Sequence, residues 1–409
     1  MDGNCACENW HRLYLTMTAP IVYLDNNATT RTAPAVVEAM NPYWSDAYYN
    51  PTSLAAHLEG IRRPLDLAVE QLAGLLNASS DEFTLTSGAT EANNWVMQSV
   101  AAERLRTTDK CHILISAIEH PSIIDTAEEL SMRDPRIEIG HVPVNHYGVL
   151  ELEVLRQMMR PETALVSVML ANNETGVIQP VHEASQIAKQ EVPECFFHSD
   201  ATQAVGKFAV DLQSLGQVDL LSLSAHKFHG PKGIGALFAR RGTRLESWMH
   251  GGSQQGGRRA GTENPALAAG LSKAVELLGS KSQIANRAKR IAGLRNSFED
   301  QLMAIHPGTL ILGQGTPRLA NTSLMVFPDA EGEMLVHLLL DQGIVASTGA
   351  ACSNGSDRPS HVVTSMGIGY ATARNALRIS LSKDSTEAEI DRCIPALRSV
   401  LVAPRSAIM

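Results

Sequence analysis

A lysine that could act as an amine nucleophile follows a buried strand near the middle of the sequence. Residues 218–223 form a largely apolar run, which is typical of a strand covered on both faces of a parallel sheet. Lys227 comes next, in a polar turn that contains Gly230 and Pro231. Partial burial there would lower the pKa of the lysine amine toward that of a useful nucleophile. For this residue taken alone, a surface lysine on a turn is the alternative.

A possible phosphate site follows the predicted strand 83–86. Gly88 allows a tight turn, and the backbone N–H groups of Ala89 and Thr90 would then face a ligand from the N-terminus of the next helix. The Thr90 hydroxyl would add a further donor. An ordinary helix N-cap with Glu91 in the first turn is the alternative.

Two other strand ends carry side chains that could hold a planar heterocycle. His120 follows the predicted strand 112–117 and could stack on a ring or move a proton. Asp200 follows the predicted strand 195–199 and could pair with a protonated ring nitrogen, as pyridoxal phosphate chemistry requires. For each residue taken alone the alternative is structural: a buried hydrogen-bonded histidine at position 120, and an aspartate in an Asx-turn or helix N-cap at position 200. Together with Lys227 and the phosphate turn, these residues indicate one pyridoxal phosphate site.

The elements that must bring these residues together alternate between strand and helix. Strands are predicted at 83–86, 112–117, 136–142, 163–170, 195–199, 218–223 and 234–239, with helices between most of them at 91–105, 122–132, 151–159 and 181–190. This alternation predicts an α/β fold with a mostly parallel seven-stranded sheet and helices on both faces. Ligands bind such sheets at the carboxyl ends of the strands, where the residues named above lie.

The pattern changes after residue 265 and predicts a smaller α+β domain. A helical stretch at 266–304 leads into short strands and helices that no longer alternate. We therefore expect a disordered leader at 1–20, a large cofactor-binding domain at 33–264, and a small domain made of 21–32 and 265–409.

The composition excludes several classes of protein. The 409 residues are 44% hydrophobic, enough for a large core, and the net charge of −9 argues against a nucleic-acid partner. No apolar run approaches the length of a membrane span, and residues 1–20 do not resemble a secretory signal, so the cytoplasm is the expected location. The six cysteines are too few for a disulfide framework. Three of them, Cys111, Cys195 and Cys393, are expected to be small buried residues.

A series of short motifs appears in a characteristic order along the chain. They are YLDNNATT (23–30), TSGATE (86–91), EH (119–120), NNE (172–174), HSDATQ (198–203), SAHK (224–227), RRAGT (258–262), STGAACS (347–353) and LR (377–378). In this order and spacing the sequence resembles the cysteine desulfurases, which are pyridoxal-phosphate enzymes of the class V aminotransferase type. The resemblance runs from about residue 21 to about residue 401 and implies the fold of the type I pyridoxal-phosphate enzymes.

The resemblance also implies a role for each matching residue. Lys227 would bind the cofactor covalently, Asp200 would pair with its pyridine nitrogen, and His120 would stack on its ring. Asn50 and Arg378 would bind the substrate carboxylate. The other cofactor ligands would be Asn173, Gln203, Ala89, Thr90, Ser224, Ala225 and His226, with Thr262 supplied by the second subunit of a homodimer.

The sulfur acceptor implied by the resemblance is Cys352, which lies among small residues in a predicted loop. Its thiolate would take sulfur from L-cysteine as a persulfide, leave L-alanine, and deliver the sulfur to an acceptor protein in iron–sulfur cluster assembly or another thiolation pathway. No resident metal is expected, and any contact with an iron–sulfur cluster would be transient, through this persulfide. The alternatives are a selenocysteine lyase, an aminotransferase or epimerase of the same class, and a non-enzymatic scaffold that has lost its cofactor.

Overall fold

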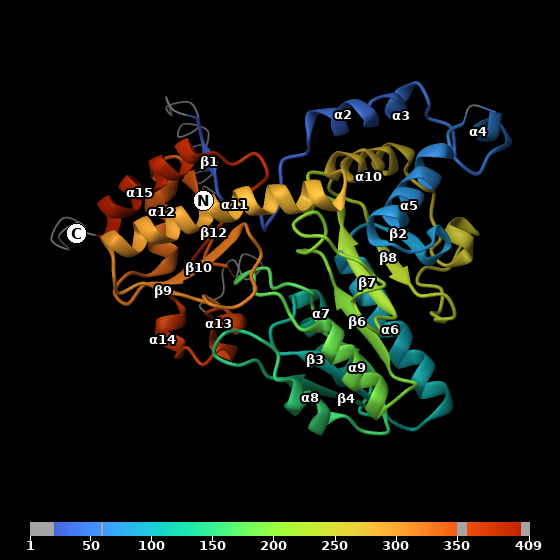
Figure 1. The fold of residues 1–409 in the computed structure, drawn as a ribbon. Coiled ribbons are helices and arrows are strands. Elements are labelled where there is room, and N and C mark those ends of the chain that lie inside the picture. Colours follow the sequence, from blue (N-terminus) through green and yellow to red (C-terminus); the bar gives the residue numbers. More distant parts are fainter. Residues whose placement is uncertain (1–19, 59, 350–357, 402–409) are drawn as a thin grey trace, which may run out of the picture.

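A seven-stranded sheet forms the centre of the chain in the computed structural model, which describes residues 20–58, 60–349 and 358–401 (Figure 1). Its strand order is β2-β8-β7-β6-β5-β3-β4, and β8 is the one strand that runs antiparallel to its neighbours. The strands are β2 (Phe83–Thr86), β3 (Cys111–Ser116), β4 (Ile137–Val142), β5 (Thr163–Ser167), β6 (Phe196–Asp200), β7 (Leu220–Ser224) and β8 (Gly235–Ala239). The mostly parallel sheet predicted from the sequence is confirmed.

Helices cover both faces of this sheet, which explains why β3, β5 and β7 are buried at every position. On one face, Trp95 of α6 and Ile123 of α7 share an apolar cluster with Ile113 of β3. On the other face, α5, α8, α9 and α10 pack on the sheet, and Leu155 of α8 shares a cluster with Leu114. These helices are α5 (Arg63–Leu76), α6 (Ala89–Thr107), α7 (Pro121–Arg133), α8 (Leu152–Met158), α9 (Val181–Glu191) and α10 (Pro265–Leu278).

A smaller α+β unit is built from both ends of the described chain. Its antiparallel sheet has the order β12-β10-β9, and β1 near the N-terminus pairs in parallel with β11. Helices α11, α12 and α15 contribute to its apolar core, which includes the fully buried Phe298 and Leu339. The elements are β1 (Val22–Tyr23), α11 (Lys281–Ile305), β9 (Leu310–Ile311), β10 (Thr322–Val326), α12 (Gly332–Asp341), β11 (Ile344–Val345), α13 (His361–Ser365), α14 (Tyr370–Ala373), β12 (Ala376–Ser380) and α15 (Glu387–Leu401).

Short helices connect the N-terminal segment to the large sheet. They are α2 (Pro34–Met40), α3 (Pro42–Ser45) and α4 (Leu54–Leu58). In Figure 1, α2 and α3 lie along α10, away from the smaller unit. The domain boundaries given above remain a prediction, and the leader at 1–20 lies outside the described residues except for Pro20.

The single helical stretch expected at 266–304 is wrong. Helix α10 ends at Leu278 and α11 begins at Lys281. Gly279 adopts a φ of 68°, a left-handed conformation that ends a helix readily because glycine has no Cβ. Ser280 then forms a capping box with Gln283 and starts the next helix.

The three cysteines expected to be buried are buried. Cys111, Cys195 and Cys393 are free thiols with at most 1% of their surface exposed. Burial raises the pKa of Cys111 to about 11 and those of Cys195 and Cys393 to about 12, so these thiols stay protonated near neutral pH. Within the described part of the chain, no helix is both long enough and apolar enough to cross a membrane.

Candidate active site

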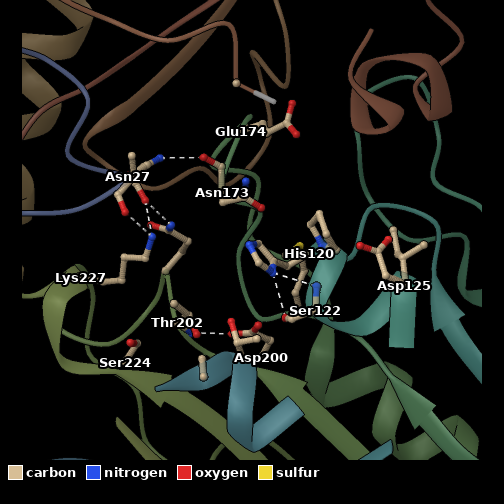
Figure 2. A pocket seen from close by; sticks show the side chains of 18 of the residues that line it. Asn27, His120, Ser122, Asp125, Asn173, Glu174, Asp200, Thr202, Ser224 and Lys227 are labelled. Carbon is tan, nitrogen blue, oxygen red and sulfur yellow. Dashed lines mark hydrogen bonds between the residues drawn. The ribbon is translucent and has the colours of Figure 1, made fainter. Parts of the chain in front are cut away.

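A cavity of about 1370 Å³ lies at the carboxyl ends of the strands of the large sheet, where the smaller unit meets it (Figure 2). Most of the site residues predicted from the sequence line it: Ala89, Thr90, His120, Asn173, Asp200, Gln203, Ser224, His226, Lys227 and Arg378. Ala225 is buried beside the cavity without lining it. Asn50 and Thr262 are exposed and do not line it within one chain. Cys352 lies outside the described residues.

The Lys227 amine is held by the N-terminal segment of the chain. Lys227 ends the short turn (Ala225–Lys227) that follows β7. Its Nζ donates hydrogen bonds to the carbonyl oxygens of Asn27 at 2.7 Å and Ala28 at 2.8 Å. Asn27 also donates from Nδ2 to the carbonyl oxygen of Asn173 at 2.9 Å, as Figure 2 shows. These two carbonyl acceptors orient the lysine amine.

Asn27 connects several other polar groups of the cavity. Gln203 donates from Nε2 to the Asn27 carbonyl oxygen at 3.0 Å. Lys207 donates to Asn27 Oδ1 at 2.7 Å and to Gln203 Oε1. Burial, with Lys227 and Arg378 nearby, holds the pKa of Lys207 well below its ordinary value. Neither residue was assigned a role from the sequence: Asn27 lies in the motif at 23–30, and Lys207 lies in none of the motifs.

Asp200 and His120 are joined by a buried polar chain. Asp200 ends β6 and is 4% exposed, and its Oδ1 accepts from the Thr202 backbone N–H at 2.9 Å. Its Oδ2 accepts from Asn93 Nδ2 at 2.8 Å, and the same amide donates to Ser122 Oγ at 2.9 Å. Ser122 Oγ lies 2.8 Å from His120 Nδ1. Sequence reasoning missed Asn93 and Ser122.

The His120 ring is neutral near pH 7. Burial lowers the pKa of His120 from its ordinary value. The Asp200 carboxylate raises this pKa and the Lys227 ammonium lowers it, and the net shift is downward. The ring can therefore lie against an apolar heterocycle face without a charge to desolvate.

The N-terminus of α6 faces the cavity, as the phosphate prediction requires. The N-cap is Gly88, which provides no side-chain hydrogen bond, and the helix continues for 19 residues. Ser224 lies close by, because a Cβ added to Gly88 would approach Ser224 Oγ to 3.3 Å. Burial and neighbouring lysines lower the pKa of His226 to about 4, so His226 offers a neutral donor there. Helix N–H groups and neutral donors are suited to a phosphate.

Arg378, on β12 of the smaller unit, also lines the cavity. It is 2% exposed, and its Nη2 donates to Asp25 Oδ1 at 2.5 Å. Its Nη1 donates to the carbonyl oxygens of Asn173 at 3.1 Å and Gly349 at 3.2 Å. Within the described part of the chain its Nε has no hydrogen-bond partner. The guanidinium is thus fixed in place, and Asp25 is a partner that the sequence did not reveal.

The residues of the cavity fit pyridoxal phosphate. The Thr202 hydroxyl lines the cavity and is buried without a hydrogen-bond partner among the described residues. Such an atom is costly unless a ligand satisfies it. Asp200 can balance a protonated ring nitrogen, and the α6 N-terminus can bind a phosphate at the far end. Across the described ranges, no group of three or more His, Cys, Asp or Glu side chains could hold a metal ion.

Comparison with known proteins agrees with this site. The family described as "Aminotransferase class-V" matches residues 22–393. A cysteine desulfurase IscS of Methanosarcina thermophila is 39% identical over 398 residues, which covers 97% of this chain and 95% of that protein. A solved "NIFS-LIKE PROTEIN" superposes with a TM-score of 0.85 at 36% identity, over 93% of this chain and 99% of its own. The solved structure "SspA in complex with cysteine" superposes with a TM-score of 0.77 at 30% identity, over 89% of this chain and 100% of its own.

These matches span nearly the whole chain, and so does the fold that they share. The mostly parallel sheet with its smaller α+β unit is the fold of the type I pyridoxal-phosphate enzymes. The chain belongs to the class V aminotransferase family, among its cysteine desulfurases. Pyridoxal phosphate is the cofactor of this family, so the resemblance and the cofactor predicted from the sequence are both confirmed.

Proposed function

We propose that this chain converts L-cysteine to L-alanine and takes the sulfur on Cys352. The observation that carries the proposal is that one cavity gathers the amine of Lys227, the carboxylate of Asp200 and the imidazole of His120 at the carboxyl ends of β7, β6 and β3. These are the groups that a cysteine desulfurase needs around its cofactor, and the chain belongs to that family.

The same residues would hold the cofactor. Lys227 would bind it covalently, Asp200 would pair with its ring nitrogen, and His120 would lie against its ring. The phosphate would take the N–H groups at the start of α6 together with Ser224 and His226. Bound pyridoxal phosphate supplies an electron sink for bonds at the substrate α-carbon.

Arg378 would bind the carboxylate of the substrate. Its planar fork can present two parallel N–H donors to a carboxylate, which fixes the orientation of the amino acid as well as its position. Two of its nitrogens are already held by Asp25, Asn173 and Gly349, so the guanidinium is preorganised before substrate arrives.

Cys352 would take the sulfur from the substrate. Its thiolate attacks the L-cysteine sulfur, the carbon–sulfur bond breaks, and its electron pair stays on carbon, which takes a proton to give L-alanine. Cys352 is left as a persulfide. Described residues before and after Cys352 in the sequence support this role, because Gly349 and Ser360 both line the cavity. Ser360 is held there by donating to Glu174 Oε2 at 2.5 Å.

Replacing the acceptor thiol tests the proposal. We expect Cys352→Ala to bind the cofactor but to lose L-alanine formation from L-cysteine by at least about 100-fold, because no thiolate can then attack the sulfur. The matched control is Cys111→Ala, which removes a buried thiol on β3 and should leave turnover close to that of the wild type. Full turnover of Cys352→Ala with L-cysteine would reject the mechanism and favour the selenocysteine lyase alternative.

We also propose that the active form is a homodimer with Thr262 contributed to the neighbouring site. Thr262 is exposed and lies outside the cavity of its own chain. The segment around Asn50 exposes large apolar side chains that a second copy would cover: Trp44 at 56%, Tyr48 at 68% and Leu54 at 80%.

Light scattering on the purified protein tests the dimer. We expect twice the mass of one chain, and we expect Leu54→Glu to shift the population toward monomer, because a buried charge opposes association. Met132→Glu is the control, since Met132 is 73% exposed on α7, away from this segment. A wild-type protein that stays monomeric at micromolar concentration would rule the shared site out.

The remaining proposals concern the sulfur acceptor and the location of the protein. We propose that a separate acceptor or scaffold protein takes the sulfur from Cys352 in the cytoplasm, since the described thiols are free and buried. Incubation with sulfur-labelled L-cysteine and fractionated cell extract should transfer the label to a protein acceptor. Recovery of the label only as free sulfide would argue against protein delivery.

A further inference from the structure

The proton on the His120 ring can be located from the hydrogen bonds at its Nδ1. His120 is the N-cap residue of α7, with Pro121 at the first helical position. The backbone N–H of Ser122 points at His120 Nδ1 over 3.1 Å. A backbone N–H can only donate, so Nδ1 must accept and carries no proton in this arrangement.

The Ser122 hydroxyl gives a second donor to the same nitrogen. Ser122 Oγ receives a hydrogen bond from Asn93 Nδ2 at 2.9 Å. The same oxygen lies 2.8 Å from His120 Nδ1 (Figure 2). Since Nδ1 already accepts from the backbone, the Ser122 hydroxyl proton is the one available for this contact. The hydroxyl therefore accepts from Asn93 and donates to His120.

The orientation of the Asn93 amide is set by Asp200. Asn93 Nδ2 lies 2.8 Å from Asp200 Oδ2, and turning the amide over would place its oxygen against a carboxylate oxygen. In the observed orientation Asn93 Oδ1 is fully buried and has no hydrogen-bond partner among the described residues. Asn93 Oδ1 is thus left without a donor, while the two N–H groups of the same amide donate to Asp200 and to Ser122.

We propose that Asn93 and Ser122 are positioning residues that hold His120 with its proton on Nε2, so that His120 acts in the cavity as a hydrogen-bond and proton donor. The direction of every bond in the chain from Asp200 through Asn93 and Ser122 follows from the fixed acceptor at Asp200 and the fixed backbone donor at Ser122. The catalytic meaning of the tautomer rests on the proposed function, but the tautomer itself does not.

This arrangement limits the proton transfers in which His120 can take part. A neutral ring that carries its proton on Nε2 has its free lone pair on Nδ1, which is already occupied by two donors. His120 can then give a proton from Nε2, and another group must take the proton that leaves the substrate. The titratable groups whose charges act on the ring are Asp200, Lys227 and His361 from other elements, and Asp125 from α7 itself.

Nitrogen NMR on the cofactor-loaded protein reads the tautomer directly. The protein would be labelled on its histidine side-chain nitrogens, and the His120 signals would be assigned by their loss in His120→Gln. Between about pH 6 and pH 8, around the ordinary histidine pKa, we expect an unprotonated Nδ1 and a protonated Nε2. A protonated Nδ1 in the wild type would overturn the proposal, and this result does not depend on whether the chain desulfurates cysteine.

Variants test the roles of Asn93 and Ser122. Hydrogen bonds donated to Nδ1 stabilise the neutral ring, so Ser122→Ala and Asn93→Leu should each raise the His120 pKa by about one unit. Ser122→Thr keeps the hydroxyl and should restore the wild-type titration. Thr126→Val is the matched control on α7, because Thr126 Oγ1 donates to the Ser122 carbonyl oxygen and does not contact the ring.

The outcomes of these variants are distinct. A raised pKa in Ser122→Ala that Ser122→Thr reverses supports the proposal, and a merely structural role would not produce this reversal. An unchanged His120 titration in folded Ser122→Ala and Asn93→Leu would overturn it. If either variant fails to fold, the wild-type spectrum still decides which nitrogen carries the proton.

Discussion

Arg378→Lys should weaken binding of L-cysteine while leaving the later chemistry nearly intact. Arg378 uses two nitrogens to hold Asp25, Asn173 and Gly349, and its Nε has no hydrogen-bond partner among the described residues. Lysine keeps the positive charge but replaces the planar fork with one nitrogen. That nitrogen cannot hold its protein partners and also present two parallel donors to a substrate carboxylate.

The size of the effect follows from the lost hydrogen bond. One hydrogen bond to a charged group is worth about 1.5–3 kcal/mol, and each 1.4 kcal/mol is tenfold in affinity. We therefore expect the KM for L-cysteine to rise by about 10- to 150-fold, with kcat changed by less than about threefold, as for a loss of uniform binding. Steady-state alanine formation over a wide range of L-cysteine concentration measures both constants.

The same substitution at Arg374 is the control. Arg374 pairs with Glu331 at 3.0 Å, and both side chains are more than 40% exposed. An exposed pair of this kind contributes little, so Arg374→Lys should leave KM within about twofold of the wild type. An unchanged KM in folded Arg378→Lys, or an equal rise in both variants, would refute the assignment of Arg378 to the substrate carboxylate.

Three further outcomes are expected from the structure. Gly235→Ala should weaken cofactor binding in a pyridoxal phosphate titration, because the new Cβ would lie only 2.8 Å from the Cα of Gly88 and displace that turn. Gly293→Ala is the control and should leave cofactor binding unchanged, since nothing lies within 4 Å of the added Cβ. Inactive Lys227→Ala and weakened Thr262→Ala chains should regain activity when mixed, since one dimer site would then carry both wild-type residues; no regain would exclude a shared site. Burial lowers the pKa of His198 to about 4 in the folded chain, whereas an ordinary histidine has a pKa of about 6.5. Between these two pH values the unfolded chain binds more protons than the folded chain, so the free energy of unfolding falls as the pH drops through this range. Urea unfolding at several pH values measures this dependence, and His198→Gln should reduce the slope of unfolding free energy against pH by up to about 1.4 kcal/mol per pH unit. An unchanged slope would mean that His198 does not contribute to the pH dependence of stability.

The strands were predictable because their signal is local. Every strand of the large sheet lies within about two residues of its predicted range, apart from the carboxyl end of β5, since a run of apolar residues between helical patterns is enough to mark it. The break between α10 and α11 was missed although it is also local. The apolar helical spacing on both sides of Gly279 outweighed the capping signal of Ser280 and Gln283.

The grouping of Lys227, Asp200 and His120 was also predictable, for a reason of topology. Parallel strands end at the same edge of a sheet, so residues that follow them must lie close together. The positions of Asn50 and Thr262 illustrate the limit of such reasoning. The family resemblance marked them as site residues, but one chain leaves both of them on its surface.

The sequence by itself determined the elements, the order of the strand ends and the kinds of chemistry that stand there. Only the tertiary structure decided which polar groups those residues meet. Arg378 pairs with Asp25 across 353 positions of sequence, and Asn93 reaches Asp200 across 107. Such partners are selected when two distant segments pack together and every buried polar atom must find an acceptor or donor. Lys227 could thus be recognised as a nucleophile once the residues at the other strand ends were considered with it, whereas the groups that orient it could not be recognised.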